Sequence, residues 1–115
     1  MGKLKFECDG NIYWIFDSGK IFDESYCEVN YAEFIKVRNI FLGGINYKVL
    51  SKDDLKRFIE ILKNFESYQL ANEVCLFIMQ NYNDDFALMI TIINNFFYFN
   101  MHLKRPNEEI LKKNR

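Results

Sequence analysis

The segment from Phe86 to Lys104, FALMITIINNFFYFNMHLK, constrains the fold most, because it is strongly apolar and its only charged residue is the last one. A membrane-spanning helix needs about 18 or more uninterrupted apolar residues. Asn94-Asn95 and Asn100 interrupt the segment, and the pieces between them have the lengths of strands. The pieces are rich in β-branched and aromatic residues, which favour strands. We therefore expect a hairpin of residues 86–93 and 96–104 rather than a membrane span.

Alternating apolar and polar residues indicate more strands elsewhere in the chain. The sequence LKFEC alternates cleanly and is followed by the turn residues Asp9-Gly10. The long stretch YCEVNYAEFIKVRNIF loses its alternation near Ala32, which predicts a bulge or a break there. Besides the hairpin above, the expected strands are 4–8, 11–17, 26–41, 45–50 and 73–82.

One helix is predicted after Ser51. This serine stands in an N-cap position and Asp54 follows three residues later, the spacing of a capping box. Apolar residues then recur with helical spacing and form one stripe. The stripe consists of Leu55, Phe58, Ile59, Leu62 and Phe65. The predicted fold class is α+β, an antiparallel sheet of about six or seven strands in hairpins and a meander, with one main amphipathic helix packed on a face.

The length of 115 residues predicts a single globular domain over residues 1–115, with 105–115 as a frayed or short helical tail. The three cysteines, Cys8, Cys27 and Cys75, are odd in number and form no Cys-x-x-Cys pair. We therefore expect reduced thiols and a cytoplasmic location. The N-terminal stretch lacks the apolar core of a signal peptide, which agrees with that location.

No motif in the chain indicates a reaction. His102 is the only histidine and has no catalytic signature around it, and its spacing from the cysteines does not fit a zinc site. The acid pairs Asp53-Asp54 and Asp84-Asp85 suit a first helical turn and a loop. We expect that the protein is not an enzyme and that it has no catalytic residue, no cofactor and no bound metal. Direct nucleic-acid binding is also not expected, because residues 67–101 contain no lysine or arginine to meet phosphates.

Acidic and tyrosine-bearing segments are the candidates for binding a partner protein. The net charge is only −1, but the stretch FDESYCEVNY at 22–31 carries three acids and two tyrosines without a base. Such a surface could face the positive groove of a nuclease, where electrostatic steering speeds association. The candidate partner-binding residues are Asp23, Glu24, Tyr26, Glu28 and Tyr31, followed by Tyr82, Asp84 and Asp85 on a second turn.

The order of these features over residues 11–104 resembles small bacterial immunity proteins of polymorphic-toxin systems, the contact-dependent growth inhibition and MafI-type or WapI-type group. The resemblance rests on YCEVNYAEFIKV, on the capped helix LSKDDLKRFIEILKNF and on the closing apolar segments, not on individual functional residues. It implies a cytoplasmic protein that binds and neutralises a cognate toxin domain, commonly a nuclease, as a monomer or weak homodimer. Two alternatives remain: a phage or mobile-element inhibitor of a host defence complex, and a self-associating structural subunit.

Overall fold

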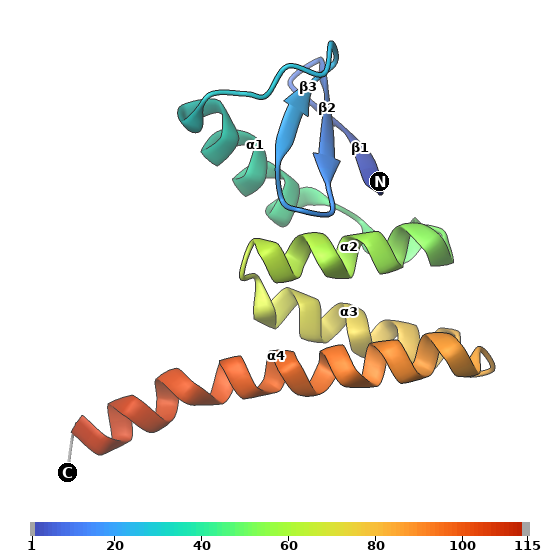
Figure 1. Ribbon diagram of the computed structural model, residues 1–115, viewed down its shortest axis with the longest axis vertical. Helices are drawn as coiled ribbons and strands as arrows, with labels where there is room; N and C mark the ends of the chain where they lie inside the picture. Colours follow the sequence, from blue (N-terminus) through green and yellow to red (C-terminus); the bar gives the residue numbers. More distant parts are fainter. Residues whose placement is uncertain (1, 114–115) are drawn as a thin grey trace. The chain divides into compact units, whose positions relative to one another are not determined.

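The computed structural model describes the backbone of residues 2–113 and the side chains of residues 2–103 (Figure 1). The chain divides into two compact units, Met1–Asn64 and Phe65–Arg115. The first unit holds the β-strands and the helices α1 and α2, and the second holds α3 and α4. This division does not test the single domain expected from the chain length, which stays a prediction.

The first unit begins with a three-stranded antiparallel sheet of β1 (Lys3–Cys8), β2 (Asn11–Phe16) and β3 (Ile21–Asp23), in that order. The predicted N-terminal hairpin is confirmed. Asp9 and Gly10 both have positive φ angles, 52° and 79°, as a two-residue hairpin turn requires. Leu4 lies opposite Ile15 in the register, and both side chains are buried.

Two helices complete the first unit, and both contact β1. The helix α1 spans Tyr31–Gly44, and α2 spans Lys52–Asn64. The rings of Phe41 in α1 and Phe58 in α2 meet edge to face, with centroids 5.5 Å apart, and both are fully buried. These rings form the centre of the core of this unit.

The predicted helix after Ser51 is confirmed as α2. The backbone N–H of Asp54 donates to Ser51 Oγ at 3.2 Å, so the serine satisfies one of the free donors of the first turn. The predicted strand over 26–41 is wrong, because α1 occupies most of it. Asn30 caps α1 by accepting from the N–H of Glu33 at 2.9 Å. The predicted strand over 45–50 is also wrong, since a short 3₁₀ helix, η1 (Tyr47–Val49), lies there.

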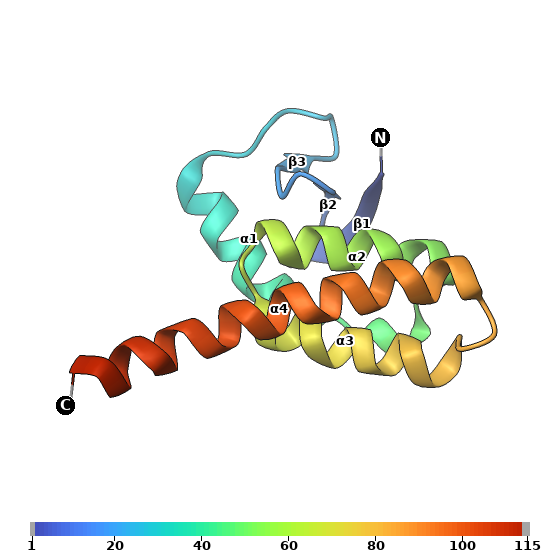
Figure 2. The same cartoon turned by 60° about the horizontal axis from the view of Figure 1, so that its bottom comes forward.

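The second unit is a hairpin of two helices, α3 (Tyr68–Asn81) and α4 (Phe86–Lys113), which lie side by side in Figure 1 and Figure 2. Asp85 begins α4 by accepting the N–H of Leu88 on its carboxylate at 3.0 Å. The predicted strands 73–82, 86–93 and 96–104 are therefore wrong. The expected tail belongs to α4 as far as Lys113, and residues 114–115 lie outside the described part of the chain.

The fold is thus α+β, but the described residues form four α-helices and a sheet of only three strands, instead of about six or seven strands with one helix. The buried positions of α4 explain the difference. Leu88, Ile92, Asn95 and Phe99 recur every three or four residues, which is the period of a helix. Two of the asparagines that we expected to break the segment bond to the preceding turn of the helix. Asn95 Nδ2 donates to the carbonyl of Thr91 at 3.0 Å, and Asn100 Nδ2 donates to that of Phe96 at 2.8 Å.

Candidate partner-binding surfaces

The connection between β3 and α1 carries the first group of candidate residues, and Asp23 organises it. The Asp23 carboxylate accepts the backbone N–H groups of Ser25 at 2.9 Å and Cys27 at 3.0 Å. The N–H of Asp23 donates to the carbonyl of Cys27 at 2.9 Å, which closes the loop. One carboxylate oxygen of Asp23 is therefore engaged within the loop, so this residue shapes the surface as well as adding charge to it.

Tyr26 lies in the same loop with a φ angle of 62°, which is unusual for a bulky side chain. Its ring stacks on Trp14 of β2 at a centroid distance of 5.4 Å and an interplanar angle of 3°. The Lys3 ammonium lies 5.6 Å from the Trp14 ring centroid and 5.7 Å from that of Tyr26. These contacts stabilise the strained backbone and fix the loop on the sheet.

A polar recess of about 310 Å³ lies between this loop, β2 and the first turn of α1. Three carboxylate residues, Asp23, Glu24 and Glu33, line the recess together with Asn11, Ile12, Tyr13 and Ser25. None of the described residues that line the recess is basic, and the ammonium of nearby Lys36 is paired with Asp9 at 3.1 Å, so the lining itself is acidic. A concave surface of this kind suits the guanidinium or ammonium group of a partner.

Tyr13 and Glu33 define the floor of this acidic recess. The Tyr13 hydroxyl donates to Glu33 Oε2 at 2.7 Å. That hydrogen bond, with burial and the nearby negative charge, raises the pKa of Tyr13 to about 12. The sequence analysis did not select either residue. The signal for Glu33 was present, because Asn30 and Glu33 have the spacing of a helix capping box.

Of the other candidates of the first group, only Glu24 lies in the lining of the recess. Glu28 is exposed where its backbone bridges Phe22. Tyr31 is 78% exposed at the start of α1. Tyr26 packs instead on Trp14, which points to the opposite face of β2 from Tyr13 because alternate strand residues face opposite ways.

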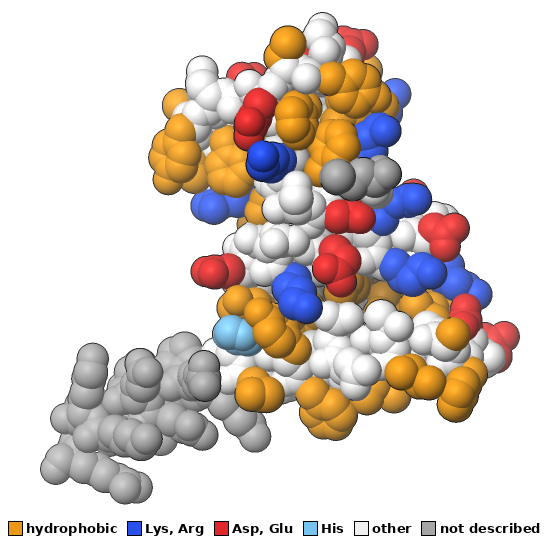
Figure 3. Space-filling view, in the orientation of Figure 1, with side chains coloured by type: hydrophobic (Ala, Val, Ile, Leu, Met, Phe, Trp, Pro, Cys, Tyr) orange, Lys and Arg blue, Asp and Glu red, His pale blue; other side chains and the backbone are white. Residues whose placement is uncertain are grey.

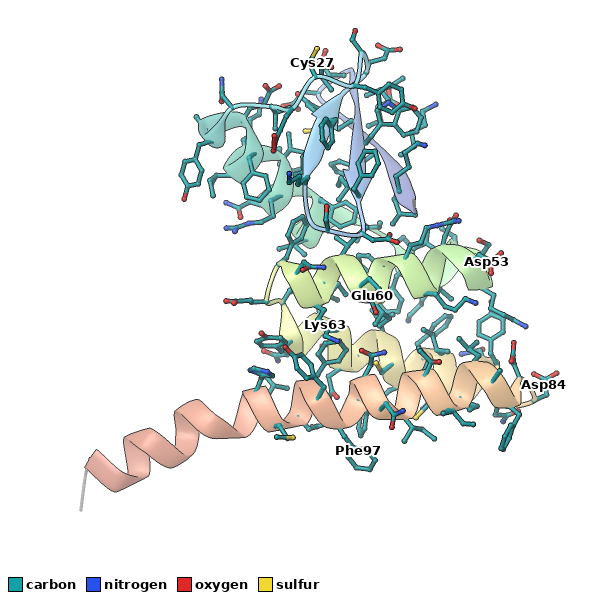
Figure 4. All side chains as sticks on the ribbon, in the orientation of Figure 1. Cys27, Asp53, Glu60, Lys63, Asp84 and Phe97 are labelled. Atoms are coloured by element: carbon teal, nitrogen blue, oxygen red, sulfur yellow. The ribbon has the colours of Figure 1, made fainter. Side chains whose placement is uncertain are left out.

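The second group lies on the turn between α3 and α4 in the other unit. Figure 4 labels Asp84 at this turn, and the residue is exposed. Asp85 caps α4 and so has a structural role. The backbone of Tyr82 closes the turn by accepting the N–H of Asp85 at 3.1 Å. Asp84 is thus the exposed carboxylate of this group, whereas Asp85 is engaged in the helix cap.

His102 packs between two tyrosines of the α3–α4 hairpin. Its ring stacks on Tyr68 with centroids 4.5 Å apart and lies 4.4 Å from the centroid of Tyr98. Burial and a hydrogen bond with Tyr98 raise the pKa of Tyr68. Over the described residues, no group of three or more histidine, cysteine or acidic side chains is placed to hold a metal ion.

The helix α4 exposes a row of large apolar side chains, which we call the apolar face. Its members are Phe86 (78% exposed), Ile90 (50%), Ile93 (41%), Phe97 (63%) and Met101 (62%). Figure 4 shows Phe97 pointing away from α3, and Figure 3 shows the hydrophobic side chains along this side of α4. The sequence analysis missed this face because it assigned these residues to two strands.

The helix α4 also bears on whether residues 86–103 could span a membrane. Residues 86–103 form one continuous helix, so strand-length pieces no longer exclude a span. By length and composition, Phe86–Leu103 is the one helix of the described chain that could cross a membrane, and 22% of that window is buried. Core helices of globular proteins meet the same criteria. The absence of a membrane partner stays a prediction.

Comparison with known proteins gives no relative for this chain: no family model, no curated protein and no solved structure matches it.

Proposed function

We propose that this protein is an immunity protein, which binds a cognate bacterial toxin domain of the nuclease class and neutralises it by forming a tight complex. The observation that carries the proposal is the acidic recess. It gathers Asp23, Glu24 and Glu33 in a lining that includes no basic side chain among the described residues. The resemblance of the sequence to small immunity proteins supports the same function.

The recess suggests how the toxin would be held. A nuclease binds phosphates with arginine and lysine side chains, and the same side chains can enter an acidic concavity. Glu24 and Glu28 are exposed and would supply steering and ion pairs, while Tyr31 offers a large exposed ring as an anchor. Asp23 would act mainly by holding the loop in shape through its two backbone hydrogen bonds.

The test is co-expression of the full chain with the toxin domain encoded by the adjacent gene. We expect the wild-type protein to protect the host cell and to form a stable complex. The double variant Glu24→Lys, Glu28→Lys should weaken binding by roughly tenfold or more, mostly through slower association at low salt. Asp23 is left unchanged so that the loop keeps its hydrogen bonds.

Glu73→Lys is the matched control, because Glu73 is an exposed acid on α3 in the other unit and its replacement changes charge in the same direction. It should leave association almost unchanged. A toxin complex that forms equally fast with the double variant would remove the acidic recess from the interface. Failure of the wild-type chain to bind or protect would reject the immunity function itself.

A further inference from the structure

The apolar face of α4 exposes a large continuous apolar area. Its five side chains are 41–78% exposed, and they expose on the order of 500 Å² of apolar surface. An apolar patch of this size is as large as the largest patch of a typical monomer, and such patches are often functional. The opposite side of α4 is already used, since Leu88, Ile92 and Phe99 are buried in the second unit.

The spacing within the face matches a helix–helix seam. Phe86, Ile90, Ile93 and Phe97 follow one another at intervals of four, three and four residues, which is the pattern of alternate core positions in a coiled coil. A second helix with the same spacing would fit against it. The exposed area of the face is also sufficient for a dimer. Two such faces would bury roughly 1,000 Å² together, which is the lower limit for a specific interface.

The charges at the two ends of the face indicate the direction of that second helix. Asp84-Asp85 precede the face in sequence, Lys104-Arg105 follow it, and no charged residue lies between them. In an antiparallel pair centred between Ile93 and Asn94, Asp84 of one copy comes level with Leu103 of the other, one residue before the basic pair. The opposed helix dipoles of such a pair attract as well.

We propose that the apolar face is a self-association surface, on which α4 pairs antiparallel with α4 of a second copy of this chain. A lipid surface fits less well, because helices that lie on membranes carry lysine and arginine beside their apolar residues. Residues 86–103 contain no lysine or arginine, and the acids at one end would be repelled by anionic lipid. The proposal concerns the second unit alone and does not rest on the immunity function.

The first test is the mass of the full chain in solution, measured by light scattering over a concentration series. We expect a species of twice the chain mass of 13.9 kDa. Phe97→Glu places a charge at the middle of the face and should raise the dissociation constant by roughly tenfold or more. Thr91→Glu is the control, because Thr91 is exposed on α4 but lies outside the apolar face. It should leave the dimer intact.

The second test fixes the direction of pairing by disulfide cross-linking, in a Cys27→Ser background that removes the one exposed native thiol. Ile93→Cys lies next to the proposed axis and should cross-link to its own copy. Phe86→Cys should not, because the two copies of residue 86 would be about 22 Å apart along the helices. A parallel pair would cross-link both variants, so cross-linking through residue 86 would overturn the antiparallel arrangement.

Other outcomes would overturn the proposal entirely. Self-association is rejected if the wild-type chain remains monomeric at the highest concentration reached. The apolar face is rejected as the dimer surface if Phe97→Glu and Thr91→Glu change the dissociation constant equally. If the chain is monomeric but binds vesicles of phosphatidylcholine and phosphatidylglycerol, and Phe97→Glu abolishes that binding, the occupant of the face is lipid instead of a second copy.

Discussion

The two units of this chain use different kinds of side chain to define their surfaces. In residues 1–64, polar groups fix the connections, as Asp23 does in its loop and Ser51 at the start of α2. In residues 65–103 there are four acids and no lysine or arginine, and much of the α4 surface is apolar. The first unit therefore presents charge held in a defined shape, while the second presents a hydrophobic stripe.

The contrast between the acidic recess and the apolar face indicates that one chain can carry surfaces suited to two kinds of partner. A charged, concave surface selects a partner by its electrostatics and speeds the encounter. An uncharged apolar stripe gains most from complementary apolar packing, which a second copy of the same helix supplies. The acidic recess and the apolar face should accordingly respond to different mutations.

The largest expected effect is the difference in stability loss between substitutions on the buried and the exposed side of α4. Phe99 is fully buried, so Phe99→Ala should lower the free energy of unfolding by about 3–5 kcal/mol. Phe97 is 63% exposed, and Phe97→Ala should change that free energy far less when measured on monomeric protein. Urea denaturation followed by circular dichroism measures both. Equal losses would contradict the helix, because residues 97 and 99 share a face only in a strand.

A smaller effect compares the helix caps of the two units. Ser51→Ala removes the cap of α2, and Asp85→Ala removes the cap of α4. Each should cost about 1 kcal/mol of unfolding free energy. Asp84→Ala is the control for the second cap, since it changes the neighbouring charge without touching the bond to Leu88. If Asp84→Ala were as damaging as Asp85→Ala, the assigned start of α4 would be wrong.

The smallest expected effect is the contribution to stability of one tyrosine in each unit, whose pKa is raised by the fold. The pKa of Tyr13 is raised to about 12, first by its bond to Glu33, whereas that of Tyr68 is raised first by burial. A raised pKa means that the neutral phenol stabilises the fold below pH 10, and that this contribution is lost as the pH rises toward 12.

Ultraviolet absorbance of the phenolate can follow these titrations. Glu33→Ala should return the late step of Tyr13 toward its ordinary pKa and leave that of Tyr68 in place. The variant Tyr13→Phe identifies which step belongs to Tyr13. A late step that persists unchanged in Glu33→Ala would show that Glu33 is not its cause.

The sequence predicted those parts of the fold that local signals specify. The hairpin of β1 and β2 has clean alternation and a turn that tolerates positive φ, and α2 has a cap and a strong apolar stripe. The same logic failed for α3 and α4, because isoleucine and phenylalanine favour strands when their period is not weighed against their type. Tertiary burial of Ile92 and Phe99 prevailed over that preference.

Two signals in the chain could have corrected the error. From Ile45 to Arg105 there is no glycine or proline, so the two strongest turn-forming residues are missing where a many-stranded meander needs several tight turns. Asn30 and Glu33 have capping-box spacing, which marks the start of α1. The acidic recess was only half predictable, because Asp23 and Glu24 stand out in sequence, whereas Tyr13 and Glu33 join them through the fold.

The central claim is that the acidic recess and the apolar face act independently. Light scattering on mixtures of this chain with the toxin domain proposed as its partner tests this claim most directly. We predict that Glu24→Lys, Glu28→Lys keeps the dimer but binds the toxin more weakly. Phe97→Glu should weaken the dimer but bind the toxin domain as the wild type does. A single variant that abolished both associations while remaining folded would contradict this account.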